Sequence, residues 1–250
     1  MRRRRNLTPF CCALISTIAI GAVAMERPAT AGDIVLPPGF TQSQFHDLSE
    51  EAGLAVSYLA AAPAAPLGFL HFDVGVEASF TQIHSNATYW QTAYSGSVPG
   101  YLAVPKLRAR LGLPFGIDVG GIYAYVPSTN VRMAGGELKW ALVKGGAIMP
   151  AIAVRGTYTT LLGVSDIDMQ TYGADVSISK GFAIFTPYLG VGQVWIRSKD
   201  SSSTVVLSAE NISRTRGFVG LQIGIPLISF VAEAAFSSIP TYTARLSVGF

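Results

Sequence analysis

Hydrophobic and polar residues alternate along most of the chain after residue 67. In the stretch 68–82, apolar residues occupy every second position, and polar residues or glycines fill the positions between them. The apolar set is Leu70, Phe72, Val74, Val76, Ala78 and Phe80. The same period returns at 101–113, 169–180 and 242–250. Because successive side chains of a β-strand point to opposite faces, each stretch predicts a strand with one apolar and one polar face.

The same template fits ten stretches of the chain, each close to the roughly 9–11 residues that a tilted membrane-crossing strand needs. An even number of strands is typical of membrane barrels. The ten stretches are 68–82, 101–113, 116–127, 131–143, 150–162, 169–180, 186–198, 213–225, 228–237 and 242–250. The prediction is an all-β fold: a transmembrane antiparallel up-and-down β-barrel of about ten strands over residues 67–250.

The final stretch ends the chain on a terminal phenylalanine. Its alternating apolar residues are Tyr242, Ala244, Leu246, Val248 and Phe250. This pattern resembles the last strand of bacterial outer-membrane β-barrel proteins, whose final Phe is recognised by the barrel-assembly machinery. The resemblance implies an outer-membrane location, Tyr242, Leu246, Val248 and Phe250 as an assembly signal, and outer-membrane lipid, lipopolysaccharide and the assembly machinery as partners. It indicates a class of protein, and no activity follows from the class.

The connections between the predicted strands alternate in length. Segments 83–100 and 199–212 are long and 163–168 is open, whereas Pro114-Phe115 and Pro226-Leu227 are tight. Outer-membrane barrels have short periplasmic turns and longer external loops, and an even strand count places both ends of the chain in the periplasm. The alternation therefore supports the barrel independently of the strand pattern.

Composition agrees with this interpretation. Half of the residues are hydrophobic and only 13% are charged, yet no apolar run after residue 31 approaches the roughly 20 residues of a membrane helix. A barrel spreads apolar residues over alternate positions, which explains high hydropathy without a long apolar run. A soluble β-sandwich would also show alternation and turns, but it would seldom be so poor in charge.

The first 31 residues have the features of a secretory signal peptide. Arg2 to Arg5 precede an apolar stretch from Phe10 to Ala24, and Ala29-Thr30-Ala31 fits a cleavage site, as does a cut after Ala24. The alternative is an uncleaved anchor. Both cysteines, Cys11 and Cys12, lie in this segment, so the chain after cleavage has no thiol for a disulfide or a metal.

The net charge of the chain after the predicted signal peptide is close to zero. Residues 32–250 hold 13 lysines and arginines against 14 aspartates and glutamates, so 13 − 14 gives a net charge of −1. This charge does not support nucleic-acid binding.

Residues 32–66 do not follow the period of two. Thr41 and Gln44 match a helix capping box, and apolar residues recur at helical spacing until Pro63 and Pro66. This pattern predicts one N-terminal amphipathic helix at about 41–61. The segment would be periplasmic or would plug the barrel, and the sequence leaves open whether the helix enters the lumen, covers the barrel mouth or lies on the membrane.

The polar face of the strands would point into the lumen and carries many charges. In a barrel of about ten strands such charges pair in a closed interior or line a narrow passage. Closely spaced cations inside walls of low dielectric constant would attract anions, which makes a small anionic solute a candidate ligand. The predicted lumen-lining residues are Lys106, Arg108, Arg110, Glu137, Lys139, Arg155, Asp175, Arg197, Arg214, Arg216, Glu233 and Arg245.

Catalytic and metal sites have little support in the sequence. The run His84-Ser85-Asn86 faintly resembles the His-x-Ser-Asn motif of outer-membrane lipid A deacylases, but the spacer residue is missing, and adjacent strand positions face opposite sides. The acids Asp166, Asp168, Asp200 and Glu210 on predicted loops could offer oxygen ligands to calcium, yet none forms a dense acidic motif. No catalytic residue, cofactor or metal is predicted.

Two functions agree with these features. The first is a narrow porin-like or substrate channel with mild anion preference. The second is a closed structural or adhesive barrel that acts through its extracellular loops. An outer-leaflet lipid-modifying enzyme is a third, weaker hypothesis, which would depend on His84.

Overall fold

The computed structural model describes residues 34–126 and 129–250 of the chain. The predicted signal peptide, with Cys11 and Cys12, lies outside the described residues. Two helices, α1 (Gln42–Val56) and α2 (Thr88–Ala93), and a short 3-10 turn, η1 (Pro114–Gly116), accompany the strands. Among the described residues no helix is long and apolar enough to span a membrane.

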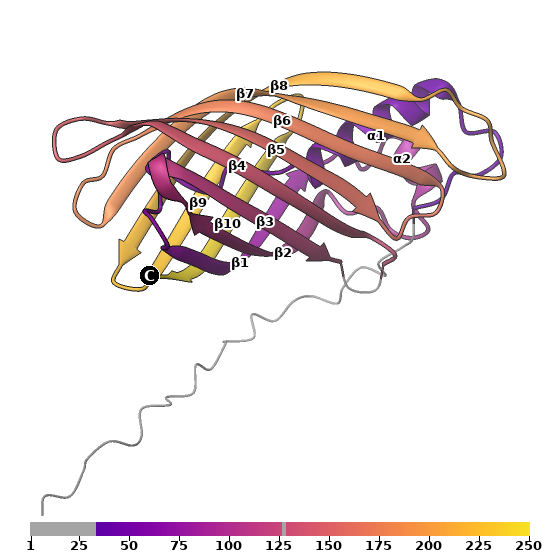
Figure 1. Ribbon diagram of the computed structural model, residues 1–250. Coiled ribbons are helices and arrows are strands. Elements are labelled where there is room, and N and C mark those ends of the chain that lie inside the picture. Colours follow the sequence, from indigo (N-terminus) through magenta and orange to yellow (C-terminus); the bar gives the residue numbers. More distant parts are fainter. Residues whose placement is uncertain (1–33, 127–128) are drawn as a thin grey trace, which may run out of the picture.

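Ten antiparallel strands form one closed barrel, as the alternating pattern predicts (Figure 1). Each strand pairs with its neighbours in sequence, and β1 pairs with β10 to close the barrel, which excludes a β-sandwich. The strands are β1 (Phe72–Gln82), β2 (Tyr101–Gly112), β3 (Ile117–Tyr125), β4 (Arg132–Lys144), β5 (Ala151–Leu162), β6 (Ile167–Ser179), β7 (Phe185–Asp200), β8 (Glu210–Ile225), β9 (Ile228–Phe236) and β10 (Pro240–Gly249).

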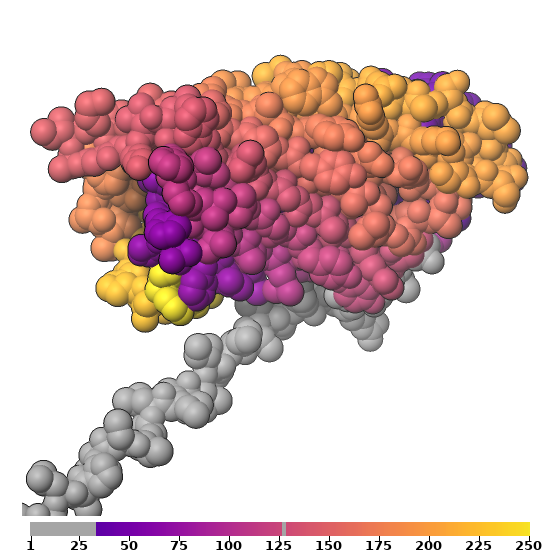
Figure 2. All heavy atoms as spheres, viewed as in Figure 1, coloured from indigo at the N-terminus to yellow at the C-terminus, as the bar shows by residue number. Residues whose placement is uncertain are grey.

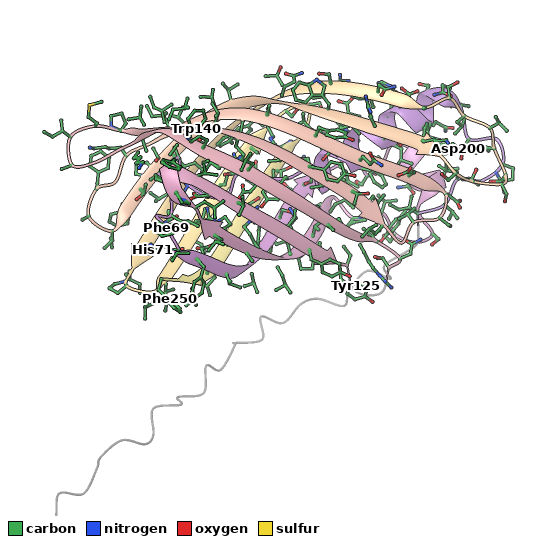
Figure 3. All side chains as sticks on the ribbon, in the orientation of Figure 1. Phe69, His71, Tyr125, Trp140, Asp200 and Phe250 are labelled. Atoms are coloured by element: carbon green, nitrogen blue, oxygen red, sulfur yellow. The ribbon has the colours of Figure 1, made fainter. Side chains whose placement is uncertain are left out.

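The two ends of the barrel differ in their connections. The short connections 113–116, 145–150, 180–184 and 226–227 lie at one end, here called the turn end, together with Phe250. The connections 83–100, 126–131, 163–166, 201–209 and 237–239 lie at the other, the loop end. Figure 3 shows His71 and Phe250 at the turn end and Asp200 at the loop end.

The two faces of each strand have opposite chemistry. Apolar side chains cover the outside: Val76 is 56% exposed and Leu246 is 52% exposed. Trp140 projects from the same outer wall (Figure 3). Charged residues such as Glu77 and Arg108 point inward and are almost completely buried. This is the inverse of a soluble domain and matches a barrel whose outer wall contacts lipid.

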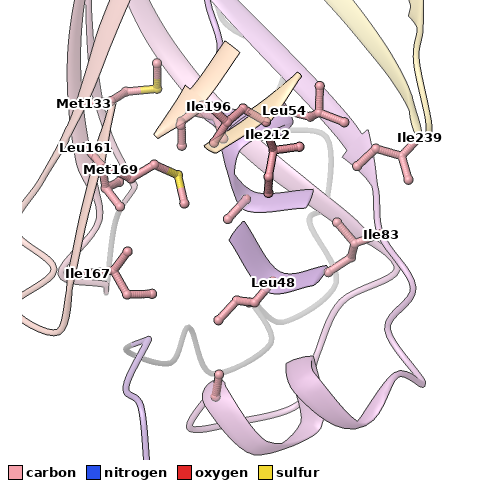
Figure 4. Packing of buried hydrophobic residues seen from close by; sticks show 14 of the residues in the cluster. Leu48, Leu54, Ile83, Met133, Leu161, Ile167, Met169, Ile196, Ile212 and Ile239 are labelled. Carbon is pink, nitrogen blue, oxygen red and sulfur yellow. The ribbon is translucent and has the colours of Figure 1, made fainter. Parts of the chain in front are cut away.

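Helix α1 lies inside the barrel at the loop end. It begins with the predicted capping box, in which the Thr41 hydroxyl accepts from the Gln44 N–H and the Gln44 side chain accepts from the Thr41 N–H. The apolar face of the helix packs against lumen-facing side chains of several strands (Figure 4). Residues in this apolar cluster include Phe45, Leu48, Leu54, Trp90, Met133, Met169, Ile196 and Ile212. The loop-end half of the lumen is therefore a hydrophobic core.

The helix is shorter than the predicted span 41–61. It ends at Val56, and Ser57 is already extended. The prolines at 63 and 66 do not set this end. Instead, lumen side chains bind the backbone of residues 56–60, because Thr159 donates to the Val56 carbonyl and arginines donate to the carbonyls that follow. These hydrogen bonds hold the extended backbone that follows the helix in place.

The plugged lumen as candidate functional site

The N-terminal segment passes through the whole barrel. At the loop end, the Leu36 N–H donates to Asp166 at 3.0 Å, and Thr204 donates to the Leu36 carbonyl at 2.7 Å. At the turn end, the Leu67 N–H donates to both carboxylate oxygens of Asp118, at 3.1 and 3.2 Å. Residues 34–67 are called the plug below. Its indigo atoms are visible at both ends of the barrel in Figure 2.

This path differs from the expectation that both chain ends lie at the turn end. The barrel strands themselves follow that rule, since the Phe72 N–H donates to the Phe250 carbonyl at 2.9 Å. The chain that precedes Phe72 runs back through the lumen, however, so residue 34 forms a β-bridge with Tyr94 of the loop 83–100. An even strand count places only the ends of the strands; it does not place a segment that enters the barrel.

Three lumen cations hold the plug through its backbone carbonyls. Arg216 donates to the Tyr58 carbonyl at 2.7 Å and to the Ser57 hydroxyl at 2.8 Å. Arg108 donates to the carbonyls of residues 59 and 60 at 3.0 and 3.4 Å. Lys139 donates to those of residues 63 and 65 at 3.0 and 2.9 Å. Because these cations are fully buried, the plug carbonyls supply hydrogen bonds that water cannot supply there.

Lumen acceptors satisfy the N–H groups of the same extended segment. Glu233 accepts from the Ala61 N–H at 2.7 Å and from the Tyr188 hydroxyl at 2.8 Å. The Ser179 hydroxyl accepts from the Ala65 N–H at 3.2 Å. The barrel wall therefore binds both polar groups of the plug backbone, as a neighbouring strand would do in a sheet.

The remaining lumen charges pair with one another. Glu77 contacts Arg108 at 2.7 Å and Lys106 at 3.3 Å, and all three side chains are fully buried. Asp175 binds Arg155 through two hydrogen bonds of 2.8 and 3.0 Å. Further pairs join Asp73 to Arg110 and Arg245, Asp118 to Lys139, and Glu137 to Arg108 and Arg155. Removing one member of such a pair would leave a buried, unpaired charge, which is strongly destabilising.

Most of the predicted lumen residues lie together inside the barrel. Arg214 also points inward, but at the loop end, where it is 36% exposed and binds Glu50 of α1 at 2.6 Å. Burial alone would raise the pKa of Glu50, but the hydrogen bond and charge of Arg214 lower it. The buried residues are Lys106, Arg108, Arg110, Glu137, Lys139, Arg155, Asp175, Arg216, Glu233 and Arg245.

Arg197 is an exception, and the prediction that it lines the lumen is wrong. Its side chain lies on the outer wall over the ring of Tyr172, 5.8 Å from the ring centre. The inward residues at this level of β7 are Val194 and Ile196, which pack against α1. Because the helix creates an apolar core inside the barrel, the residues of β7 that face inward here are apolar. Arg197, which alternates with them, therefore faces outward.

The sequence pattern missed Glu51, the most highly connected acid of the plug. Its carboxylate accepts from the Trp90 indole at 2.6 Å, from the Tyr89 hydroxyl at 3.0 Å, and from the N–H and ring of His84. The hydrogen bond and charge of Glu51 raise the pKa of His84 above its usual 6.5. A signal was present in the sequence, because Glu51 falls on the apolar face of α1 beside Leu48 and Leu54.

The other sequence candidates have structural roles in the described chain. His84 binds Glu51, and no hydrogen bond between its ring and Ser85 is found among the described residues. Asp166 holds the plug, Asp200 accepts from two N–H groups of its own loop, and Glu210 contacts His46 at 2.8 Å. Within residues 34–126 and 129–250, no three His, Cys, Asp or Glu side chains are placed to hold a metal ion.

The predicted assembly residues lie at or near the seam where β10 meets β1. Tyr242, Leu246 and Val248 are outward and about half exposed. The Phe250 ring packs edge-on against Phe72, with ring centres 4.2 Å apart. Recognition of these residues by the assembly machinery stays a prediction.

Comparison with known proteins gives similarities of structure only. No family model matches the sequence, and no curated protein matches it. A structure of Ail, the attachment invasion locus protein of Yersinia pestis, in complex with the heparin analogue sucrose octasulfate, matches with 14% identity and a TM-score of 0.32, covering 73% of this chain and all of that one. Neisserial surface protein A (NspA) matches with 13% identity and a TM-score of 0.30, covering 71% of this chain and 94% of that one.

Proposed function

We propose that this protein is a bacterial outer-membrane barrel that its own N-terminal plug keeps closed, and that it acts at the cell surface through its loop end. The observation that carries the proposal is the bonding of the plug, whose backbone is bound on both sides by buried lumen residues. The apolar outer wall supports the membrane location. Closure of the lumen makes the second of the two sequence hypotheses, a structural or adhesive barrel, the better supported one.

The loop end offers a surface of mainly polar side chains, many of them uncharged. Asn86, Thr88, Gln91 and Thr92 are exposed on the first loop, and the loop 201–209 exposes further hydroxyl groups. Val206, at the tip of that loop, is fully exposed. Amide and hydroxyl groups can donate and accept hydrogen bonds without a charge. Asp47, Asp168 and Lys199 are exposed at the same end, so this surface suits a polar partner.

Single-channel recording of the complete chain in a planar bilayer tests closure. We expect no steady conductance, because the plug and the paired charges fill the lumen. Steady conductance of the unmodified protein would refute the closed barrel and favour the narrow channel.

Attachment of cells that express the protein tests the role of the loops. Replacing residues 201–208 by a glycine-serine segment of equal length should reduce attachment to a surface that the parent strain binds. Replacement of residues 146–149, at the turn end, is the matched control and should have no effect. Equal attachment by both variants would argue against a loop-based function.

A second function, a channel that opens when the plug is displaced, is favoured by one observation. Arg108, Lys139 and Arg216 direct hydrogen bonds to plug carbonyls, so plug displacement would expose three cations to the lumen. Arg216→Met weakens the plug and breaks no ion pair among the described residues. Brief, anion-preferring openings in this variant, absent from the outer-wall control Arg132→Met, would support the gated channel; silence in both would refute it.

A further inference from the structure

A small apolar cavity of about 80 Å³ lies in the loop-end half of the lumen. Ala52 and Val56 of α1 line it, together with Val104 of β2 and Leu161 of β5. The ring of Trp90, which is completely buried, also lines it. Leu161 belongs to the interior cluster that Figure 4 shows. The plug, the first loop and the wall thus enclose this space together, and it is called the loop-end cavity.

The polar groups of two lining residues are bound by other partners. The Trp90 indole N–H donates to Glu51 at 2.6 Å, and the Thr129 hydroxyl donates to the Val126 carbonyl at 2.9 Å. Most of the other lining side chains are aliphatic or aromatic. A buried water molecule needs two to four polar partners, and apolar cavities without them stay dry and accept apolar molecules. The chemistry of the lining therefore favours an apolar occupant.

The barrel wall beside the cavity lacks part of its hydrogen-bond ladder. Within the described residues, the pairing of β2 with β3 ends at Lys106 and Ala124, although β2 continues to Tyr101 and stays paired with β1. The outward residue Ala103 and the inward residue Val104 both line the cavity at this level. The cavity therefore reaches residues of both faces of the wall where the ladder is missing. This part of the wall is called the β2–β3 gap.

Pro105 explains why the ladder ends there. The Gly112 N–H donates to the His71 carbonyl, on the β1 side, whereas the Leu113 N–H donates to the Ile117 carbonyl, on the β3 side. Successive residues of a strand direct their N–H groups to opposite neighbours, so the odd-numbered residues of β2 direct theirs toward β3. Pro105 is one of these residues and has no N–H to donate. The hydrogen bond that would extend the ladder beyond residue 106 is therefore missing.

The gap opens close to the boundary of the membrane. Tyr101 begins β2 and Tyr125 ends β3, and their side chains are 48% and 47% exposed on the outer wall. Figure 3 shows Tyr125 in this position. Outer-membrane barrels carry girdles of such aromatic residues at both membrane boundaries. A molecule dissolved in the outer leaflet would therefore meet the gap from the side.

We infer that the loop-end cavity binds a small uncharged aliphatic molecule, which enters from the membrane through the β2–β3 gap. An apolar cavity of roughly 150 Å³ accepts benzene, so a cavity of about 80 Å³ suits a molecule smaller than benzene. The acyl chain of a membrane lipid is too long for this volume. The inference adds a ligand site to the proposed closed barrel, and it requires neither conductance nor attachment.

Quenching of Trp90 fluorescence tests the site, with 1-bromopropane as the probe. Trp140 and Trp195 lie on the outer wall, so both are replaced by phenylalanine in the full chain, which leaves Trp90 as the only tryptophan. The bromine atom quenches an indole ring that it contacts. We expect saturable quenching of the refolded protein in detergent, because the cavity holds a limited amount of probe.

Two variants change the volume of the cavity. Ala52→Leu should fill it and weaken the saturable quenching by about tenfold or more. Ala109→Leu, on the outer wall and outside the cavity, is the matched control and should leave the quenching unchanged. Leu161→Ala should enlarge the cavity, so that benzene competes with the probe in this variant and not in the parent. Thermal unfolding checks that each variant is folded.

A third variant tests the route of entry. Ala103→Trp should narrow the gap, so association and dissociation of the probe should both slow severalfold in stopped-flow quenching while the dissociation constant stays the same. Unchanged rates would overturn entry through the gap.

The remaining outcomes decide the site itself. Equal quenching of the parent and Ala52→Leu, or quenching that never saturates, would overturn the cavity as a binding site. Saturable quenching by a brominated phospholipid would overturn the assignment to a small molecule. The bilayer recording and the attachment assay measure other properties, so failure of the closed barrel or of the loop function is distinguishable from failure of this site.

Discussion

At the scale of single residues, Glu51 is the acid that joins the plug to the first loop. It sits on the apolar face of α1 and is almost completely buried, yet four donors surround it. A buried carboxylate is tolerated when its hydrogen bonds are complete. Glu51 therefore fixes the depth of the helix in the barrel, because α1 cannot shift without breaking several of these bonds together.

Replacing Glu51 by alanine should lower the free energy of unfolding by about 2 kcal/mol, since the buried Trp90 indole N–H would lose its acceptor. Urea unfolding followed by tryptophan fluorescence measures this change. Asp47→Ala, on the exposed side of the same helix, is the control and should have little effect. Equal stability of the two variants would show that the Glu51 contacts do not hold the plug.

His84 should make stability depend on pH. Because the hydrogen bond and charge of Glu51 raise the pKa of His84, its stabilising effect is complete below the usual value of about 6.5 and is lost as the pH rises through the raised value. The difference in melting temperature between the parent and His84→Gln should therefore shrink from pH 5.5 to pH 9. The effect will be small, because the His84 side chain is 71% exposed. A difference that does not change with pH would contradict the assignment.

At the scale of elements, the strands follow from the sequence and the plug does not. All ten strands were predictable because apolar residues that face outward alternate with polar residues that face inward over much of the barrel. That rule failed at Arg197, because α1 supplies an apolar surface inside the barrel and the inward face of β7 changes character there. The residue at which α1 ends could not be predicted from the sequence either, because Arg216 and Thr159 lie more than one hundred residues away from the carbonyls that they bind.

Close contact between α1 and β7 depends on the absence of a side chain at Gly53. A Cβ atom there would lie 2.5 Å from Ile196, so the helix could not approach the wall as closely. Gly53→Ala should therefore destabilise the parent protein by about 1 to 3 kcal/mol through overpacking. In an Ile196→Ala background the same change should instead stabilise by about 1 kcal/mol, because alanine favours helix more than glycine does. A double-mutant cycle by chemical unfolding measures both effects; the same sign in both backgrounds would exclude direct packing of Gly53 on Ile196.

At the scale of the whole molecule, the plug carries the N-terminal part of the described chain from the turn end of the barrel to the loop end. The strands begin and end at the turn end, which in outer-membrane barrels faces the periplasm. The plug nevertheless leaves residues 34–40 among the connections of the loop end, where Leu36 binds two of them. Both ends of the barrel thus receive a part of the N-terminal segment, and the loop-end surface includes the start of α1.

Cysteine labelling on intact cells tests this arrangement directly. After signal cleavage the predicted chain has no cysteine, so a single introduced thiol reports on one position. Val206→Cys at the loop end and Ser43→Cys at the start of α1 should both react with a maleimide that cannot cross membranes, because both positions are exposed at the same end. Phe115→Cys, 83% exposed at the turn end, should react only after the outer membrane is permeabilised. If Val206→Cys reacts and Ser43→Cys does not, the start of α1 is not at the outer surface. If only Phe115→Cys reacts, the turn end faces outward and the orientation of the barrel is opposite to the one proposed. The labelling of Ser43→Cys is the decisive result, because an N-terminal segment that remained in the periplasm would leave this residue on the opposite side of the membrane.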